Sequence, residues 1–106
     1  MARKSTTVPV QSSAARACRI LKALKGQSFS GLSNKELAES LGELPSAISL
    51  SLNTLEAEGL VTRLENGRYA HSVQLLQIAQ AHVEHVNQMQ ARMQEINARI
   101  LSGARP

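Results

Sequence analysis

The chain has 106 residues and a formal net charge of +4 at pH 7, with one Phe, one Tyr and no Trp. This length fits one domain with one modest core, which has to be aliphatic. A single cysteine excludes an internal disulfide, and no apolar run is long enough for a membrane span or a secretory signal. We therefore expect a cytoplasmic protein without membrane contact, with Cys18 packed in its core. The moderate basic excess suits a polyanionic partner.

The N-terminal part of the chain predicts an arm followed by a helix. Residues 1–11 are basic and show no periodicity, so we interpret them as a flexible basic arm. Apolar residues then recur at helical spacing. This pattern predicts a helix that has Ser12 or Ser13 as its N-cap and stops at Gly26.

Two further helices are expected on either side of a very short turn. Ser33 and Glu36 have the spacing of a capping box, and Gly42 ends the helix that they begin. Pro45 suits the first turn of the next helix, which ends near Gly59. This spacing is typical of a helix-turn-helix.

A β-hairpin is predicted directly after the third helix. Residues 60–64 and 68–71 have strand character, and Asn66-Gly67 is a strong two-residue hairpin signal because both positions accept positive φ. A two-stranded ribbon is only marginally stable alone, so it must pack against the helices. The order of the elements predicts a mostly α fold with a small β-hairpin. We interpret residues 12–71 as a winged helix-turn-helix domain in which the hairpin is the wing.

Residues 72–101 contain no Pro or Gly and predict one long C-terminal helix, on the order of 40 Å in length, before a short tail at 102–106. Apolar side chains alternate by three and four residues along it, which is the seam of a coiled coil. We therefore expect a homodimer formed through this helix. The predicted dimerisation residues are Leu75, Ala79, His82, Val86, Met89, Met93, Ile96 and Ile100.

Four stretches of the chain together resemble the DNA-binding domain of IclR-type transcription regulators. They are "SAARACRILKAL", "GLSNKELAESLG", "SAISLSLNTLEAEGLV" and "NGRYAHSVQLLQIA", and the resemblance covers residues 13–79. It implies a winged helix-turn-helix that binds operator DNA as a dimer. In that family a linker helix leads to a ligand-sensing domain. Only the first part of the pattern is present here, so we expect no small-molecule effector.

Candidate contacts to double-stranded DNA lie on the third helix, on the wing and at the start of the second helix. Serine and asparagine can read base edges, and lysine and arginine can contact phosphates. The chain departs from the family pattern because it has no Lys or Arg from residue 44 to residue 58. DNA shape and backbone contacts should therefore take a larger share of recognition. The predicted DNA-binding residues are Lys35, Ser46, Ser49, Asn53, Arg63 and Arg68.

Enzymatic and metal-dependent functions find little support in the sequence. The chain has no Asp, no glycine-rich phosphate loop and no nucleophile with an evident base, so we expect no enzyme and no cofactor. His82 and His85 lie three residues apart on the long helix but lack a third ligand, so we expect no metal site.

The sequence thus predicts a sequence-specific DNA-binding transcription regulator, a dimeric repressor that acts by operator occupancy. Two alternatives stay open. The winged domain can be a protein–protein interaction module, which the uncharged third helix and its apolar Leu50 favour. It can also be an architectural DNA-binding protein with low sequence preference, for which the basic arm and the wing suffice.

Overall fold

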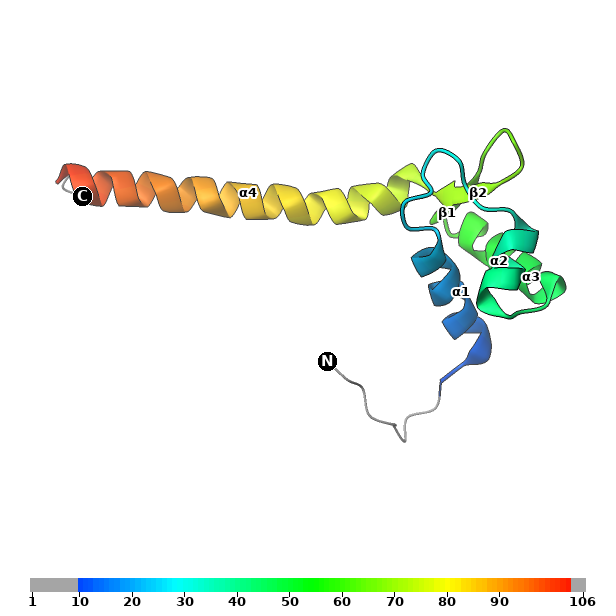
Figure 1. Cartoon of the computed structure of the whole chain (residues 1–106). Helices are drawn as coiled ribbons and strands as arrows, with labels where there is room; N and C mark the ends of the chain where they lie inside the picture. Colours follow the sequence, from blue (N-terminus) through cyan, green and yellow to red (C-terminus); the bar gives the residue numbers. More distant parts are fainter. Residues whose placement is uncertain (1–9, 104–106) are drawn as a thin grey trace. The chain divides into compact units, whose positions relative to one another are not determined.

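The structure is a computed structural model that describes residues 10–103 (Figure 1). In chain order its elements are α1 (Ser12–Ala23), α2 (Asn34–Leu41), α3 (Pro45–Ala57), β1 (Val61–Arg63), β2 (Tyr69–His71) and α4 (Val73–Ser102). The predicted fold class, mostly α with a small hairpin and a long C-terminal helix, is confirmed. The chain divides after Leu75 into two compact units, which are described separately. Most of the predicted arm at 1–11 and of the tail at 102–106 lies outside the described residues.

The core of the first unit is aliphatic, as the composition requires. α1 packs against both α2 and α3, and α3 also packs against β1. Apolar residues one helical turn apart, such as Ile20 and Leu24 or Ile48 and Leu52, face this core because they lie on the same side of their helices. The largest fully buried side chains are Ile20, Leu24, Leu37, Ile48, Leu52 and Val61.

Two details of α1 differ from the sequence prediction. Cys18 is exposed, so the prediction of a buried thiol is wrong. Ile20 lies on the buried face of α1, and Cys18 lies about 200° around the helix from it, on the opposite side. The serine N-cap prediction is also wrong, because the carbonyl of Gln11 already accepts the amide of Ala15 at 2.9 Å and Ser12 is the first helical residue.

The helix-turn-helix forms through the predicted signals. The Ser33 hydroxyl accepts the amide of Glu36 at 3.1 Å, and the Glu36 carboxylate accepts the amide of Ser33 at 2.9 Å, which completes the capping box. Gly42 ends α2 with a φ of 67°, in the left-handed region that glycine adopts without a steric cost. Pro45 stands in the first turn of α3, where its missing amide hydrogen is not needed.

The wing is an antiparallel hairpin whose turn differs from the prediction. Its register pairs Val61 with His71 and Arg63 with Tyr69. The loop has three residues, 65–67. They are closed by two backbone hydrogen bonds: the amide of Leu64 donates to the carbonyl of residue 68 at 2.7 Å, and the amide of Gly67 donates to the carbonyl of Leu64 at 2.9 Å. Only Gly67 has positive φ there, at 84°, so the expected two-residue turn with positive φ at both positions is wrong.

The hairpin is extended by a backbone bridge that the sequence analysis did not foresee. Leu32 and Tyr69 exchange two backbone hydrogen bonds, of 2.9 and 2.8 Å, so the loop before α2 pairs with β2. Gly31 stands beside this bridge with a φ of 71° and is buried. Because a two-stranded ribbon is weak alone, this third segment attaches the wing to the helices.

The start of α4 is held by Ser72, which is buried. Its hydroxyl accepts the amide of Leu75 at 3.0 Å, as an N-cap does, and donates to the carbonyl of Gly59 at 2.6 Å. The helix therefore begins one residue after the predicted start. No residue of α4 is buried. Across residues 10–103, no helix combines the length and the apolarity that a membrane crossing requires.

The bridge at Gly31 generates a stability prediction with a matched control. An added Cβ at Gly31 would lie 2.8 Å from the Tyr69 carbonyl oxygen and 2.9 Å from the Cβ of Arg68, whereas one at Gly26 meets nothing within 4 Å. Both glycines have positive φ, so both alanine variants carry backbone strain of about 1 kcal/mol. We expect Gly31→Ala to lose about 2 kcal/mol more than Gly26→Ala in urea unfolding, because of overpacking. Equal losses would contradict the tight contact.

Candidate nucleic-acid interface

The outward face of α3, the second helix of the helix-turn-helix, is exposed. The core side of α3 carries Ile48 and Leu52. The opposite side carries four exposed residues at helical spacing, i, i+4, i+7 and i+11. They are Ser46, Leu50, Asn53 and Ala57. This stripe, opposite the core side, is the face of α3 that is open to solvent.

The stripe is uncharged, and it mixes hydrogen-bonding groups with hydrocarbon. The side chains of Ser46 and Asn53 have no hydrogen-bond partner within residues 10–103, while Leu50 is 68% exposed. Ser49 lies beside the stripe, and its hydroxyl accepts a 2.7 Å hydrogen bond from the side-chain amide of Asn34. The same side-chain amide also donates to the backbone carbonyl of residue 45. Ser49 therefore joins α3 to the start of α2 and keeps its hydroxyl hydrogen available for a partner.

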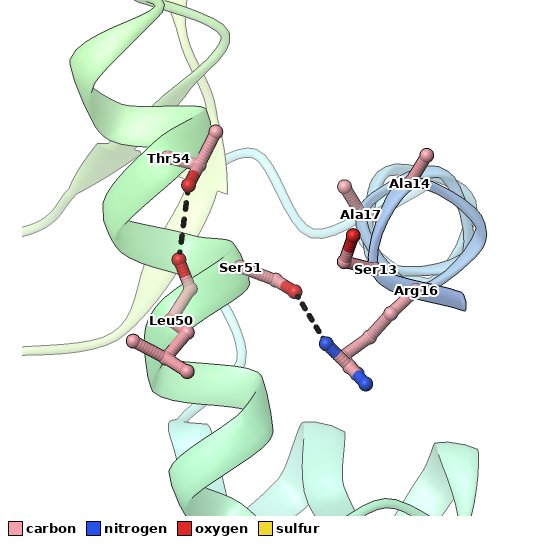
Figure 2. Close-up of a pocket in the computed structure, with 7 residues that line it drawn as sticks. All are labelled: Ser13, Ala14, Arg16, Ala17, Leu50, Ser51 and Thr54. Atoms are coloured by element: carbon pink, nitrogen blue, oxygen red, sulfur yellow. Dashed lines mark hydrogen bonds between the residues drawn. The ribbon is translucent and has the colours of Figure 1, made fainter. Parts of the chain in front are cut away.

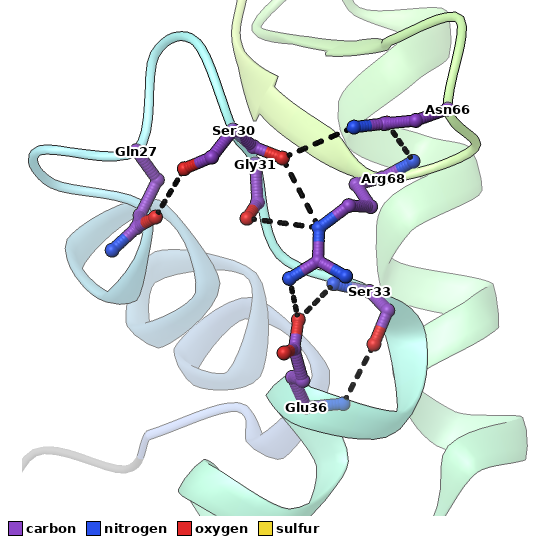
Figure 3. Close-up of polar contacts among 7 residues, drawn as sticks. All are labelled: Gln27, Ser30, Gly31, Ser33, Glu36, Asn66 and Arg68. Carbon is purple, nitrogen blue, oxygen red and sulfur yellow. Dashed lines mark hydrogen bonds and ion pairs between the residues drawn. The ribbon is translucent and has the colours of Figure 1, made fainter.

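Arg68 connects the wing to the helix-turn-helix (Figure 3). Its Nε donates to the carbonyl oxygens of Ser30, at 3.1 Å, and Gly31, at 3.3 Å. Its Nη2 makes an ion pair with Oε1 of Glu36 at the start of α2. At the wing tip, Asn66 donates to the same Ser30 carbonyl at 3.4 Å and accepts the amide of Arg68 at 2.9 Å. Two of the five side-chain N–H donors of Arg68, one on Nε and one on Nη2, are thus used inside the domain.

Glu36 is the common acceptor of this cluster. One of its oxygens accepts both the amide of Ser33 and the guanidinium of Arg68. The hydrogen bond from the Ser33 amide, followed by the bond from Arg68, lowers the pKa of the Glu36 carboxyl below its ordinary value of 4.5, because both favour the charged form. The same carboxylate therefore caps α2 and fixes the wing.

Arg63, on the other arm of the wing, is held more loosely. Its guanidinium lies 3.7 Å from the carboxylate of Glu56 and 5.2 Å from the ring centre of Tyr69. The Arg63 side chain is 53% exposed, against 35% for Arg68. Exposed ion pairs of this kind are weak, so Arg63 can exchange Glu56 for a phosphate at little cost.

The basic residues of α1 and α2 also include some that form ion pairs inside the domain and some that do not. Arg16 and Arg19 of α1 both bind the carboxylate of Glu43 in the turn between α2 and α3. Lys35, in the first turn of α2, is exposed and makes no ion pair in the described part of the chain. Lys22 of α1 is likewise exposed and makes no ion pair within the described residues. The arginines of α1 thus stabilise the turn, while lysines remain free to meet an anion.

A shallow groove of about 340 Å³ runs between α1 and α3 (Figure 2). Arg16 crosses it and donates to the hydroxyl of Ser51 at 3.4 Å, and Thr54 donates to the carbonyl of Leu50 at 3.2 Å. Alanines 14 and 17 supply much of the α1 side. The groove contains no cluster of acid, base and nucleophile, and residues 10–103 hold no group of three metal-ligating side chains.

The predicted DNA-binding residues fall into two groups. Lys35, Ser46, Ser49 and Asn53 lie together on α2 and α3 of the helix-turn-helix, and all but Ser49 make no side-chain hydrogen bond within the described residues. The two arginines lie on the wing and both have acidic partners. The sequence analysis missed the contacts of Asn34 with Ser49 and of Glu36 with Arg68, because no local pattern marks contacts between side chains 15 and 32 residues apart.

The predicted seam residues lie along α4 in the second unit, apart from Leu75, which ends the first unit and is half-buried. The other seven are exposed. Val86 and Met89, near the middle, are 36% and 41% exposed, and Ile100 is 68% exposed. A run of large apolar side chains this long on one helix is unusual for a surface that faces only water.

Comparison with known proteins agrees with this geometry. A family model described as the IclR helix-turn-helix domain matches residues 13–65. A mutant of MepR from a multidrug-resistant S. aureus clinical isolate has 16% identity and a TM-score of 0.54, over 89% of this chain and 87% of that chain, and so has the same fold. A mutant of Lactococcus lactis ZitR has 22% identity and a TM-score of 0.47, over 93% and 68%. No curated protein matches the chain significantly.

The lowered pKa of Glu36 generates a prediction of acid sensitivity. A carboxyl with a depressed pKa in the folded state stabilises the fold above about pH 4.5, and this stability is lost as the pH falls through the depressed value. We expect Glu36→Gln, which keeps a capping acceptor but not the charge, to lose less thermal stability than the wild type between about pH 7 and pH 3. Glu39→Gln, on an exposed position of α2, is the control and should behave as the wild type. Identical acid profiles for all three proteins would refute the role of Glu36.

Proposed function

The chain belongs to the IclR helix-turn-helix family of DNA-binding transcription regulators, and from that premise we propose that it binds specific double-stranded sites as a homodimer. The observation that carries the proposal is the outward face of α3, which is exposed and bears unpartnered groups that can read base edges. Repression by occupancy of the operator is the simplest mechanism, because it needs only binding. The protein then acts in the compartment that holds the DNA, which agrees with the expected cytoplasmic location.

In this proposal α3 enters the major groove and the wing lies along the neighbouring backbone. Ser46, Ser49 and Asn53 face the bases from α3. Lys35 and Arg63 supply phosphate contacts, because their charges are free or only loosely paired. Arg68 has a different role, because it orients the wing through its contacts with Glu36 and with the loop before α2. Its side chain is 35% exposed, so the guanidinium hydrogens that those bonds leave unused can add a phosphate contact.

We assign the exposed apolar seam of α4 to a second copy of the chain. Its side chains recur at coiled-coil spacing, and burying them against an identical helix removes apolar surface from water without an additional partner. A dimer provides two copies of α3, which suits an operator with two-fold symmetry. No small-molecule effector enters this mechanism.

A second candidate function is a protein-interaction module, which the neutral α3 face and its exposed Leu50 favour. An architectural role, with binding that depends little on sequence, is the third. The three functions differ in what they predict for DNA: a sequence preference, no binding, or binding without preference.

The test of the proposed function is selection from random-sequence duplexes and from fragmented genomic DNA at about 50 and 200 mM salt, followed by sequencing. We expect enrichment of a roughly palindromic site that persists at the higher salt concentration. Binding that is steep in salt and without enrichment would favour the architectural role. Absence of binding at the lower salt concentration would refute DNA recognition and direct attention to a protein partner.

The dimer has its own test, in a matched pair of lysine substitutions on α4. Met89 lies in the seam, and Ala91 lies about 200° around the helix from it. We expect Met89→Lys to weaken dimerisation roughly 100-fold or more, because it buries an unpaired charge, and Ala91→Lys to have little effect. Analytical ultracentrifugation measures both. A wild-type monomer at micromolar concentration, or equal effects of the two substitutions, would contradict dimerisation through this seam.

A further inference from the structure

We infer that α3 reads A·T base pairs, with Leu50 against the methyl group of thymine and Asn53 on adenine. This inference rests on the proposed DNA binding and names the kind of sequence that the site selects. It follows from three properties of the outward face of α3: its accessible hydrocarbon, its single unengaged amide and its lack of charge.

Leu50 occupies the centre of the stripe on α3. It lies one helical turn after Ser46 and one turn before Asn53, so the three side chains point to the same side. Leu50 is 68% exposed, although the same helix buries Ile48 and Leu52 almost completely. In the major groove the apolar group of a base edge is the C5-methyl of thymine, so a leucine at this place has one natural contact.

Asn53 supplies the polar part of the same readout. Its side chain has no hydrogen-bond partner in the described part of the chain, so both its donor and its acceptor are available. Asparagine pairs with adenine through N6 and N7, where one acceptor and one donor are needed. Adenine and the thymine methyl belong to A·T pairs, so the two residues select the same kind of sequence.

Guanine is disfavoured for the complementary reason. The commonest specific contact to guanine is a lysine or arginine that bonds O6 and N7. α3 has no basic residue, and Ser46 and Ser49 can donate only one hydrogen bond each. Lys35, which makes no ion pair in the described residues, lies on α2. The half-site under α3 should therefore be rich in A·T pairs, and the contacted thymines should be identifiable by their methyl groups.

Replacement of thymine by deoxyuridine tests this inference, because it removes only the methyl group. The probe is the duplex most enriched from the random pool by the full chain, synthesised with single thymine-to-deoxyuridine changes in each half-site. We expect one or two positions per half-site to lose about fourfold in affinity, the effect of one buried methyl group. For the Leu50→Ala variant, the same thymine-to-deoxyuridine changes in the DNA should have almost no effect on affinity. Asn53→Ala should relax the preference for adenine at a neighbouring position.

Phe29→Ala is the control for a general loss of apolar surface. Phe29 is 97% exposed in the loop between α1 and α2, away from the α3 stripe, so this variant should keep the full sensitivity to deoxyuridine. An enriched site of G·C pairs, or equal deoxyuridine sensitivity in the wild type and Leu50→Ala, would overturn the inference while leaving DNA binding intact. Absence of binding to any duplex at low salt would overturn both proposals. Thermal unfolding verifies that Leu50→Ala is folded, as its exposure leads us to expect.

Discussion

Arg68 joins the wing to residues 30–36, which lie 32 to 38 residues earlier in the chain. Its guanidinium binds the carbonyls of Ser30 and Gly31 before α2 and the carboxylate of Glu36 in α2. Its backbone amide donates to the side chain of Asn66 at the tip of the wing. A hairpin of two three-residue strands cannot hold its position alone. The orientation of the wing beside α3 therefore depends on this cluster and on the adjacent backbone bridge between Leu32 and β2.

Because the ion pairs stabilise the fold, net charge is a poor guide to the binding surface of this protein. Arg16 and Arg19 hold the turn between α2 and α3 through Glu43, and Arg68 holds the wing. In residues 10–75 the positive charge that is not held in a close ion pair is carried by Lys22, Lys25, Lys35 and the loosely paired Arg63. In the proposed function, affinity comes from the edges of the domain, whereas the neutral α3 face discriminates between sequences. This division separates the residues that bind from those that select.

Local sequence signals predicted the helices, the capping box of α2, the position of Pro45 and the existence of the wing. Each depends on residues within one turn of one another, so a single stretch contains the information. The failures were of three kinds. Cys18 was assigned to the core, although α1 buries the face that carries Ile20 and Leu24. The turn type at Asn66 and the first residue of α1 were decided by backbone hydrogen bonds that several sequences can make. The ion pair of Arg68 with Glu36 could not be predicted because it depends on tertiary packing, so the sequence did not show that part of the Arg68 guanidinium is engaged inside the domain.

The most direct test of this account is the DNA affinity of Glu36→Gln compared with Glu39→Gln, each measured with and without Arg68→Ala. Both glutamine variants remove one negative charge from α2, so a general electrostatic effect is the same in both. If Arg68 acts by orienting the wing, Glu36→Gln weakens binding relative to Glu39→Gln, and Arg68→Ala adds little further loss in the Glu36→Gln background. If Arg68 instead binds phosphate directly, Glu36→Gln releases it, binding becomes tighter than in Glu39→Gln, and the loss in Arg68→Ala is undiminished. The second result would contradict the central role assigned to this cluster.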